Sequence, residues 1–128
     1  MNGITLIYSR DIGLSQTRVL MLSRIGRRAE IAVDFPAAKS ICEKGRVELA
    51  ILCHTLSDFE QMAITDMIRS RSEGTQVLTL CIGKEYDDAP PSRHLFHVED
   101  GPSAFLQKCE TLIRQQKGHS KKYTLPAC

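Results

Sequence analysis

The sequence contains no tryptophan and few other aromatic residues, with three tyrosines and four phenylalanines in 128 residues. Nucleic-acid-binding domains usually carry a clustered basic face, often with exposed aromatic side chains for stacking. Here the charges nearly balance at a formal net charge of +2, and much of the excess lies in residues 117–122 (KGHSKK). That short basic run is too sparse for such a face, so we expect no nucleic-acid partner.

Long apolar runs are also missing. Residues 4–8 (ITLIY) form a short apolar run near the N-terminus, and charged residues follow at once. This run is too short for a membrane span or for the core of a signal peptide. We therefore expect a cytoplasmic protein with no membrane partner.

The motifs that mark many enzymes are absent as well. Residues 9–13 (SRDIG), directly after the first expected strand, hold a single glycine, so neither GxGxxG nor the P-loop occurs there. The GxSxG elbow of hydrolases is absent. None of Cys42, Cys53 and Cys81 is followed six residues later by the arginine that a cysteine phosphatase needs. We predict a protein that is not an enzyme and that uses no cofactor.

The cysteine pattern does not indicate disulfides or zinc. The five cysteines are Cys42, Cys53, Cys81, Cys109 and Cys128. Their number is odd, no CxxC occurs, and none is spaced with the histidines as in a zinc finger. We expect small buried thiols in a reducing compartment and predict no metal site.

The apolar pattern alternates between strands and helices along the chain. Apolar runs predict strands over residues 4–8, 28–34, 47–53, 75–82 and 94–98. Helical spacing and capping signals predict helices over 11–25, 36–44, 57 to about 72, and 102 to about 116. The run 47–53 is nearly continuous in apolar residues, which is typical of a central parallel strand covered on both faces.

Two of the predicted helices have assignable inner faces. Residues 57–60 (SDFE) match a capping box, in which Ser57 and Glu60 bond each other's backbone amides. For the helix that follows, the expected inward residues are Phe59, Met62, Ala63 and Met67. For the last helix they are Phe105, Cys109, Leu112 and Ile113.

The alternation of five predicted strands with helices, joined by mostly short loops, predicts an α/β fold with a doubly wound, parallel, five-stranded sheet. The flavodoxin-like strand order is 2-1-3-4-5, which places any site at the carboxyl ends of strands one and three. Those ends are Tyr8–Asp11 and Cys53–Ser57. We assign residues 1–117 to this domain and residues 118–128 to a flexible basic tail, because the tail has no periodicity.

Residues 3–116 resemble the receiver domain of bacterial response regulators, most clearly at residues 47–61 (VELAILCHTLSDFEQ) and 100–113 (DGPSAFLQKCETLI). The resemblance implies a two-component signalling module. It also implies an acidic pair after strand one, a phosphoacceptor aspartate after strand three, Ser/Thr after strand four and Lys-Pro after strand five. In this chain the corresponding residues are Ser9 and Arg10, then Cys53, Cys81 and Val98-Glu99.

These replacements argue against phosphotransfer. Receiver phosphorylation needs a carboxylate nucleophile beside Mg²⁺ held by oxygen ligands, and Arg10 would repel that ion. We therefore predict a phosphorylation-independent pseudo-receiver, an adaptor that binds a protein partner and could form a homodimer. Residues 83–93 are too few for a full fourth helix, so we expect that helix to be shortened or absent. Tyr86, Phe96 and His97 are then candidates for the partner face.

Two other interpretations stay open. Cys53 and Cys81 should end neighbouring strands, and a thiol-based redox or soft-metal sensor could use them, with Arg10 favouring the thiolate. His54 could accept a phosphoryl group in place of Cys53. Strand alternation turns His54 away from its neighbour, which makes that the weaker alternative.

Overall fold

The computed structural model describes residues 3–71, 74–82 and 94–124, with side chains in the last stretch described as far as residue 115. The strands are β1 (Ile4–Tyr8), β2 (Ala29–Ala32), β3 (Val47–Leu52), β4 (Gln76–Cys81) and β5 (His94–His97). The helices are α1 (Ile12–Ser23), α2 (Phe35–Lys44), α3 (Asp58–Arg71) and α4 (Pro102–Thr124), with a short 3-10 turn at Val98–Asp100.

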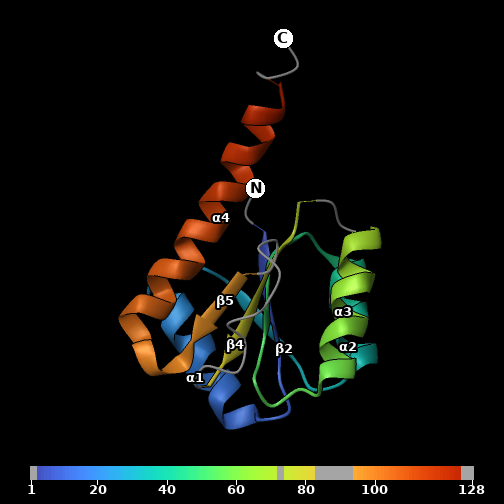
Figure 1. The fold of residues 1–128 in the computed structure, drawn as a ribbon, viewed down its shortest axis with the longest axis vertical. Coiled ribbons are helices and arrows are strands. Elements are labelled where there is room, and N and C mark those ends of the chain that lie inside the picture. Colours follow the sequence, from blue (N-terminus) through green and yellow to red (C-terminus); the bar gives the residue numbers. More distant parts are fainter. Residues whose placement is uncertain (1–2, 72–73, 83–93, 125–128) are drawn as a thin grey trace.

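The strands form one parallel sheet in the order β2-β1-β3-β4-β5, which confirms the predicted fold class and topology. Figure 1 shows α1 and α4 on one face of the sheet and α2 and α3 on the other. Crossover connections of this kind bring the carboxyl ends of all strands to one edge. The loops after β1 and β3 therefore meet there.

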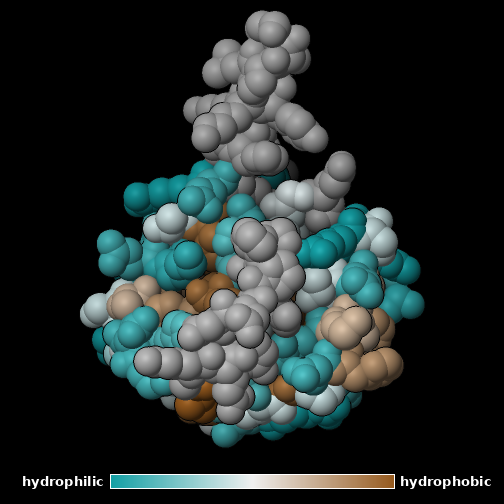
Figure 2. Space-filling model, in the orientation of Figure 1, coloured by the Kyte–Doolittle hydropathy of each residue, from teal (hydrophilic) through white to brown (hydrophobic). Residues whose placement is uncertain are grey.

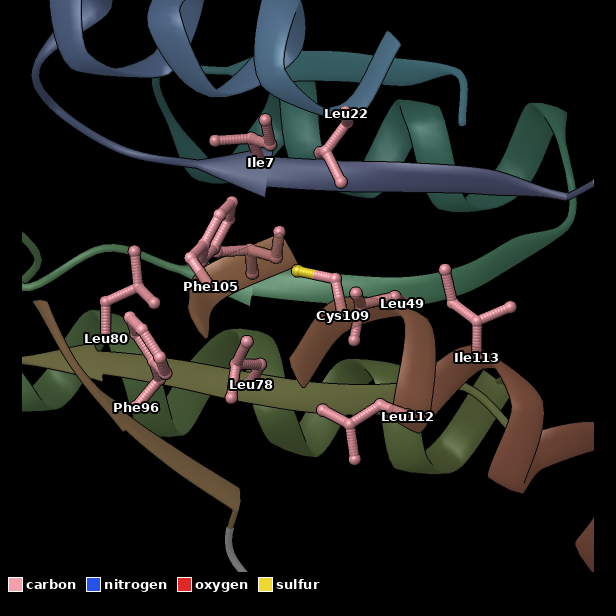
Figure 3. Close-up of a cluster of buried hydrophobic side chains, with 11 residues drawn as sticks. Ile7, Leu22, Leu49, Leu78, Leu80, Phe96, Phe105, Cys109, Leu112 and Ile113 are labelled. Carbon is pink, nitrogen blue, oxygen red and sulfur yellow. The ribbon is translucent and has the colours of Figure 1, made fainter. Parts of the chain in front are cut away.

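Two apolar layers hold the sheet in place. Every residue of β3 is buried, as its continuous apolar run predicted. Ile7, Leu49 and Ile51 face the layer under α1 and α4, which Figure 3 shows with the aromatic rings of Phe96 and Phe105. Alternate residues of the same strands face the layer under α2 and α3.

The inner face of α3 differs from the prediction. Phe59 and Met62 are 79% and 63% exposed, whereas Gln61, Ile64 and Ile68 are buried. At 3.6 residues per turn, Phe59 lies roughly opposite the Ile64–Ile68 stripe, so the two groups cannot face the sheet together. Branched aliphatic side chains fill the core here, and the prediction for Phe59 and Met62 was wrong.

The start of α3 is as predicted. The backbone amide of Glu60 donates to Ser57 Oγ at 3.1 Å, and the amide of Ser57 donates to Glu60 Oε1 at 3.1 Å. These reciprocal bonds satisfy two amides that the first turn of a helix leaves without partners.

The last helix is longer than expected. The helical backbone of α4 continues to Thr124, beyond the predicted end near Gln116, and Figure 1 shows it projecting past the sheet. The sequence also predicted a shortened or absent helix between the fourth and fifth strands. That prediction concerns residues 83–93, which lie outside the described residues. Within the part of the chain that is described, no helix combines the length and apolar character of a membrane span.

Truncation of single side chains in α3 tests its orientation. We expect Ile64→Ala to lower the free energy of unfolding by roughly 2–5 kcal/mol, because it opens a cavity in the core. Phe59→Ala is expected to change it by no more than about 0.5 kcal/mol, because the ring lies in solvent. Urea denaturation of both variants measures the difference, and a comparable loss in Phe59→Ala would mean that the ring is buried.

Candidate functional site

The loops after β1 and β3 are tied together by hydroxyl groups. Ser9 Oγ lies 3.3 Å from Thr55 Oγ1, and the backbone amide of Arg10 donates to Thr55 Oγ1 at 3.1 Å. Ser9 Oγ also accepts from the amide of Asp11 at 2.9 Å. Ser9 thus lies where the resemblance placed an acidic residue, but its hydroxyl serves to hold the two loops in register.

Arg10 extends from this edge to α3, where its guanidinium forms an ion pair with Glu60 Oε2. The bond to Glu60 raises the pKa of Arg10. Glu60 accepts from the Ser57 amide and from Arg10, and these bonds lower its pKa. The carboxylate is therefore occupied by its own helix and by a cation.

A second guanidinium lies beneath the edge, next to the thiol in the phosphoacceptor position. Cys53 is fully buried, and Arg18 Nη1 in α1 donates to its Sγ at 3.3 Å. Burial acts to raise the pKa of Cys53, but hydrogen bonds from Ser9 and Thr55 outweigh it. The charge of Arg18 also lowers this pKa, so the pKa of Cys53 lies below its ordinary value. This position therefore favours a sulfur anion more than an ordinary buried thiol would.

Two carboxylates close to the edge have structural tasks. Asp11 caps α1 by accepting from the Leu14 amide at 3.0 Å, and Asp34 caps α2 by accepting from the Ala37 amide at 2.9 Å. Over the described ranges, no group of three or more His, Cys, Asp or Glu side chains comes together as a metal site would require. The oxygen-rich cluster of a magnesium site is thus not assembled from these residues.

Cys81 ends β4, and two of its contacts are with β5. Its Sγ lies 3.4 Å from the carbonyl oxygen of Phe96 and 3.6 Å from His97 Nδ1, both in β5. Cys53 is contacted by Arg18 on α1 and by Ser9 and Thr55 in the loops after β1 and β3. These contacts of the two thiols in the sensor hypothesis thus come from different elements.

Phe96, His97 and Val98 lie in β5 or directly after it. Phe96 is only 8% exposed and packs edge-on against Phe105 at a centroid distance of 5.8 Å, so little of its ring can meet a partner. His97 is half-buried beside Cys81. Val98 begins the 3-10 turn where the resemblance placed a lysine, and it contributes no charge. Tyr86 lies outside the described residues.

Two residues at this edge were missed by the sequence analysis. Arg18 is 7% exposed and lies on the same face of α1 as the buried Ser15 and Leu22. The signal was a charged residue at helical spacing within the apolar stripe of a helix. Thr55 gave no comparable signal, because a hydroxyl in a loop is common.

Comparisons with known proteins identify the fold. No family model matches the chain, and no curated protein matches its sequence. Among solved structures, adenylate cyclase from Rhodopirellula baltica is similar with a TM-score of 0.81 and 16% identity, over 99% of this chain and 98% of that one.

Receiver domains are similar as well. A CheY-like response regulator receiver protein from Methanospirillum hungatei has a TM-score of 0.76 and 17% identity, over 93% of this chain and 99% of that one. The receiver domain of a sensor histidine kinase from Pseudomonas aeruginosa, with magnesium in its active-site cleft, has a TM-score of 0.71 and 14% identity, over 88% and 98%. At these identities the likeness establishes a CheY-like receiver fold and leaves function to the site.

The lowered pKa of Cys53 predicts a pH-dependent stability. In the unfolded chain the Cys53 thiol has a pKa of about 8.5. In the folded chain its pKa is lower, so the folded chain releases this proton at a lower pH than the unfolded chain does. We therefore compare the free energy of unfolding of the wild type with that of Cys53→Ala. The wild-type value minus the variant value should rise with pH between the folded and the unfolded pKa of Cys53, and level off above about pH 8.5. Urea denaturation from about pH 6 to about pH 9 measures it.

Cys109→Ala is the matched control. Burial raises the pKa of the Cys109 thiol to about 12. The corresponding difference should stay flat below about pH 8.5 and fall above it, because only the unfolded chain then loses the proton. A flat difference for Cys53 throughout the range would contradict the role assigned to Arg18, Ser9 and Thr55.

Proposed function

We propose that this protein is a pseudo-receiver, a signalling adaptor that has the receiver fold and acts without being phosphorylated. In receiver domains an aspartate after strand three accepts the phosphoryl group, beside a magnesium ion held by acidic residues. Here those positions hold Cys53, Ser9 and Arg10. The observation that supports the proposal is the placing of two guanidinium groups, Arg10 and Arg18, beside this edge.

The electrostatic argument follows from the ligands that magnesium prefers. Mg²⁺ binds hard oxygen ligands in near-octahedral geometry and gives up its water reluctantly. Ser9 offers a hydroxyl already bonded to Thr55 and Asp11, and Cys53 offers a soft sulfur contacted by Arg18. Ser9 carries no charge, sulfur is a poor ligand for magnesium, and the nearby arginines oppose the approach of a divalent cation.

An adaptor also needs a surface for its partner. Phe59 and Met62 lie one turn apart on α3, and both side chains are mostly exposed. Figure 2 shows apolar surface over this helix. Exposed apolar patches on small domains often mark sites of protein contact. This supports a protein partner, which could be a second copy of the chain, and we propose no enzymatic activity.

Treatment with a small phosphodonor tests the proposal. We expect the wild-type protein to keep its intact mass when incubated with acetyl phosphate and Mg²⁺, because no carboxylate nucleophile lies in the acceptor position. Intact-mass spectrometry on the unfractionated protein gives the result. A receiver domain with its acidic residues in place, treated in the same tube, shows that the reagent is active.

Addition of one phosphoryl group to the wild type would overturn the proposal, whichever residue carries it. Peptide mapping would then separate Cys53 from His54. The triple variant Ser9→Asp, Arg10→Asp, Cys53→Asp is the converse test: phosphorylation gained by this variant alone would locate the block in these three residues.

The thiol-sensor hypothesis makes a different prediction. The lowered pKa of Cys53 favours reactivity, but its side chain is fully buried, and a reagent needs access as well as a thiolate. We expect burial to dominate, so that native-state alkylation by iodoacetamide is slower at Cys53 than at a free unactivated thiol. Peptide mapping over time, with an unstructured cysteine-containing peptide in the same tube as the free-thiol reference, measures the rates. Faster alkylation at Cys53 would favour the sensor.

A further inference from the structure

An apolar hollow lies on the α1 and α4 side of the sheet, near its carboxyl edge. Its volume is about 250 Å³. Most of its lining side chains are apolar, among them Leu80, Phe96 and Phe105, and Thr17 and Arg18 also line it. Figure 3 shows three of these side chains, Leu80, Phe96 and Phe105, gathered at one end of the core. The walls are mostly hydrocarbon, and Arg18 is the single charged residue among them.

Arg18 has few partners for a buried cation. It is 7% exposed, and its hydrogen bond within the described residues goes to Cys53 Sγ at 3.3 Å. A guanidinium carries five N–H donors, and sulfur is a weak acceptor. No carboxylate forms an ion pair with Arg18 in the part of the chain that the structure describes. Buried charges are normally paired, so this cation has unused capacity for an anion.

We propose that this hollow binds a small apolar carboxylate, whose anionic group pairs with Arg18 and whose hydrocarbon part lies among the apolar walls. The planar guanidinium matches the two oxygens of a carboxylate. Besides Arg18, the walls offer one hydroxyl, that of Thr17, so a sugar or another strongly polar ligand would leave its polar groups without partners. A cation would be repelled.

The size of the hollow limits the ligand. Sites for drug-sized molecules usually measure about 300–1,000 Å³, and the volume here is about 250 Å³. A short fatty acid or an aryl carboxylate is therefore the appropriate class. A purely apolar segment of a partner could cover the same walls, but it would make no use of the buried cation. This inference does not depend on whether the protein can be phosphorylated.

The site is linked to the acceptor position through Arg18. The negative charge of a bound carboxylate offsets the positive charge that Arg18 places beside Cys53 Sγ. The ligand should therefore weaken the effect by which Arg18 lowers the pKa of Cys53, and that pKa should rise on binding. The pKa of Cys53 should thus report whether the hollow is occupied, although the ligand does not contact this thiol.

Calorimetric titration of the full chain with octanoate tests the site, with 1-octanol and octylammonium as ligands of equal chain length and different charge. We expect octanoate to bind at least about tenfold more tightly than either, because only its carboxylate forms charge-assisted hydrogen bonds with Arg18. Arg18→Met should weaken octanoate binding by about tenfold or more. Arg28→Met is the control, since Arg28 is exposed and pairs with Glu30 away from the hollow.

The outcomes separate the alternatives. Equal binding of octanoate and octanol would mean an apolar groove without anion recognition, and no binding of octanoate would exclude the site. If Arg18→Met fails to fold, the wild type still decides. The ¹³Cβ shift of labelled Cys53, followed across pH with and without saturating octanoate, should show the pKa rising on binding. An unchanged titration would contradict the proposal.

Discussion

Positive charge at the carboxyl edge of β1 and β3 constrains what this protein can do. Arg10 is held there by Glu60, and Arg18 approaches from below and contacts Cys53. A receiver phosphorylation site depends on carboxylates that concentrate negative charge around a divalent cation. In this chain Asp11 and Asp34 cap helices and Glu60 pairs with Arg10.

The fold tolerates this change because its stability lies elsewhere. The sheet is held between two apolar layers, and the whole of β3 is buried. The residues that follow β1 and β3 lie beyond these layers and are joined by Ser9 and Thr55. The core therefore positions the loops, and the loop residues decide the chemistry, as is general for folds with sites at the ends of parallel strands.

The sequence predicted the sheet and the positions at its edge for local reasons. The continuous apolar run of β3 and the Ser57–Glu60 capping box are short-range signals, and both match the structure. The prediction of the inner face of α3 was wrong because Phe59 and Ile64 are both apolar, and only the packing of the helix decides which of them is buried. Arg18 was missed because its partner is 35 positions away in the chain.

The most direct test of the charge at this edge is a magnesium titration followed by backbone amide NMR. We expect no saturable shift at the amides of Arg10 and Cys53 when Mg²⁺ is added, and only the small, uniform changes that ionic strength causes across the surface. Saturable shifts confined to the loops after β1 and β3 would mean that the edge binds the metal despite its two arginines. That result would contradict a phosphorylation-independent role.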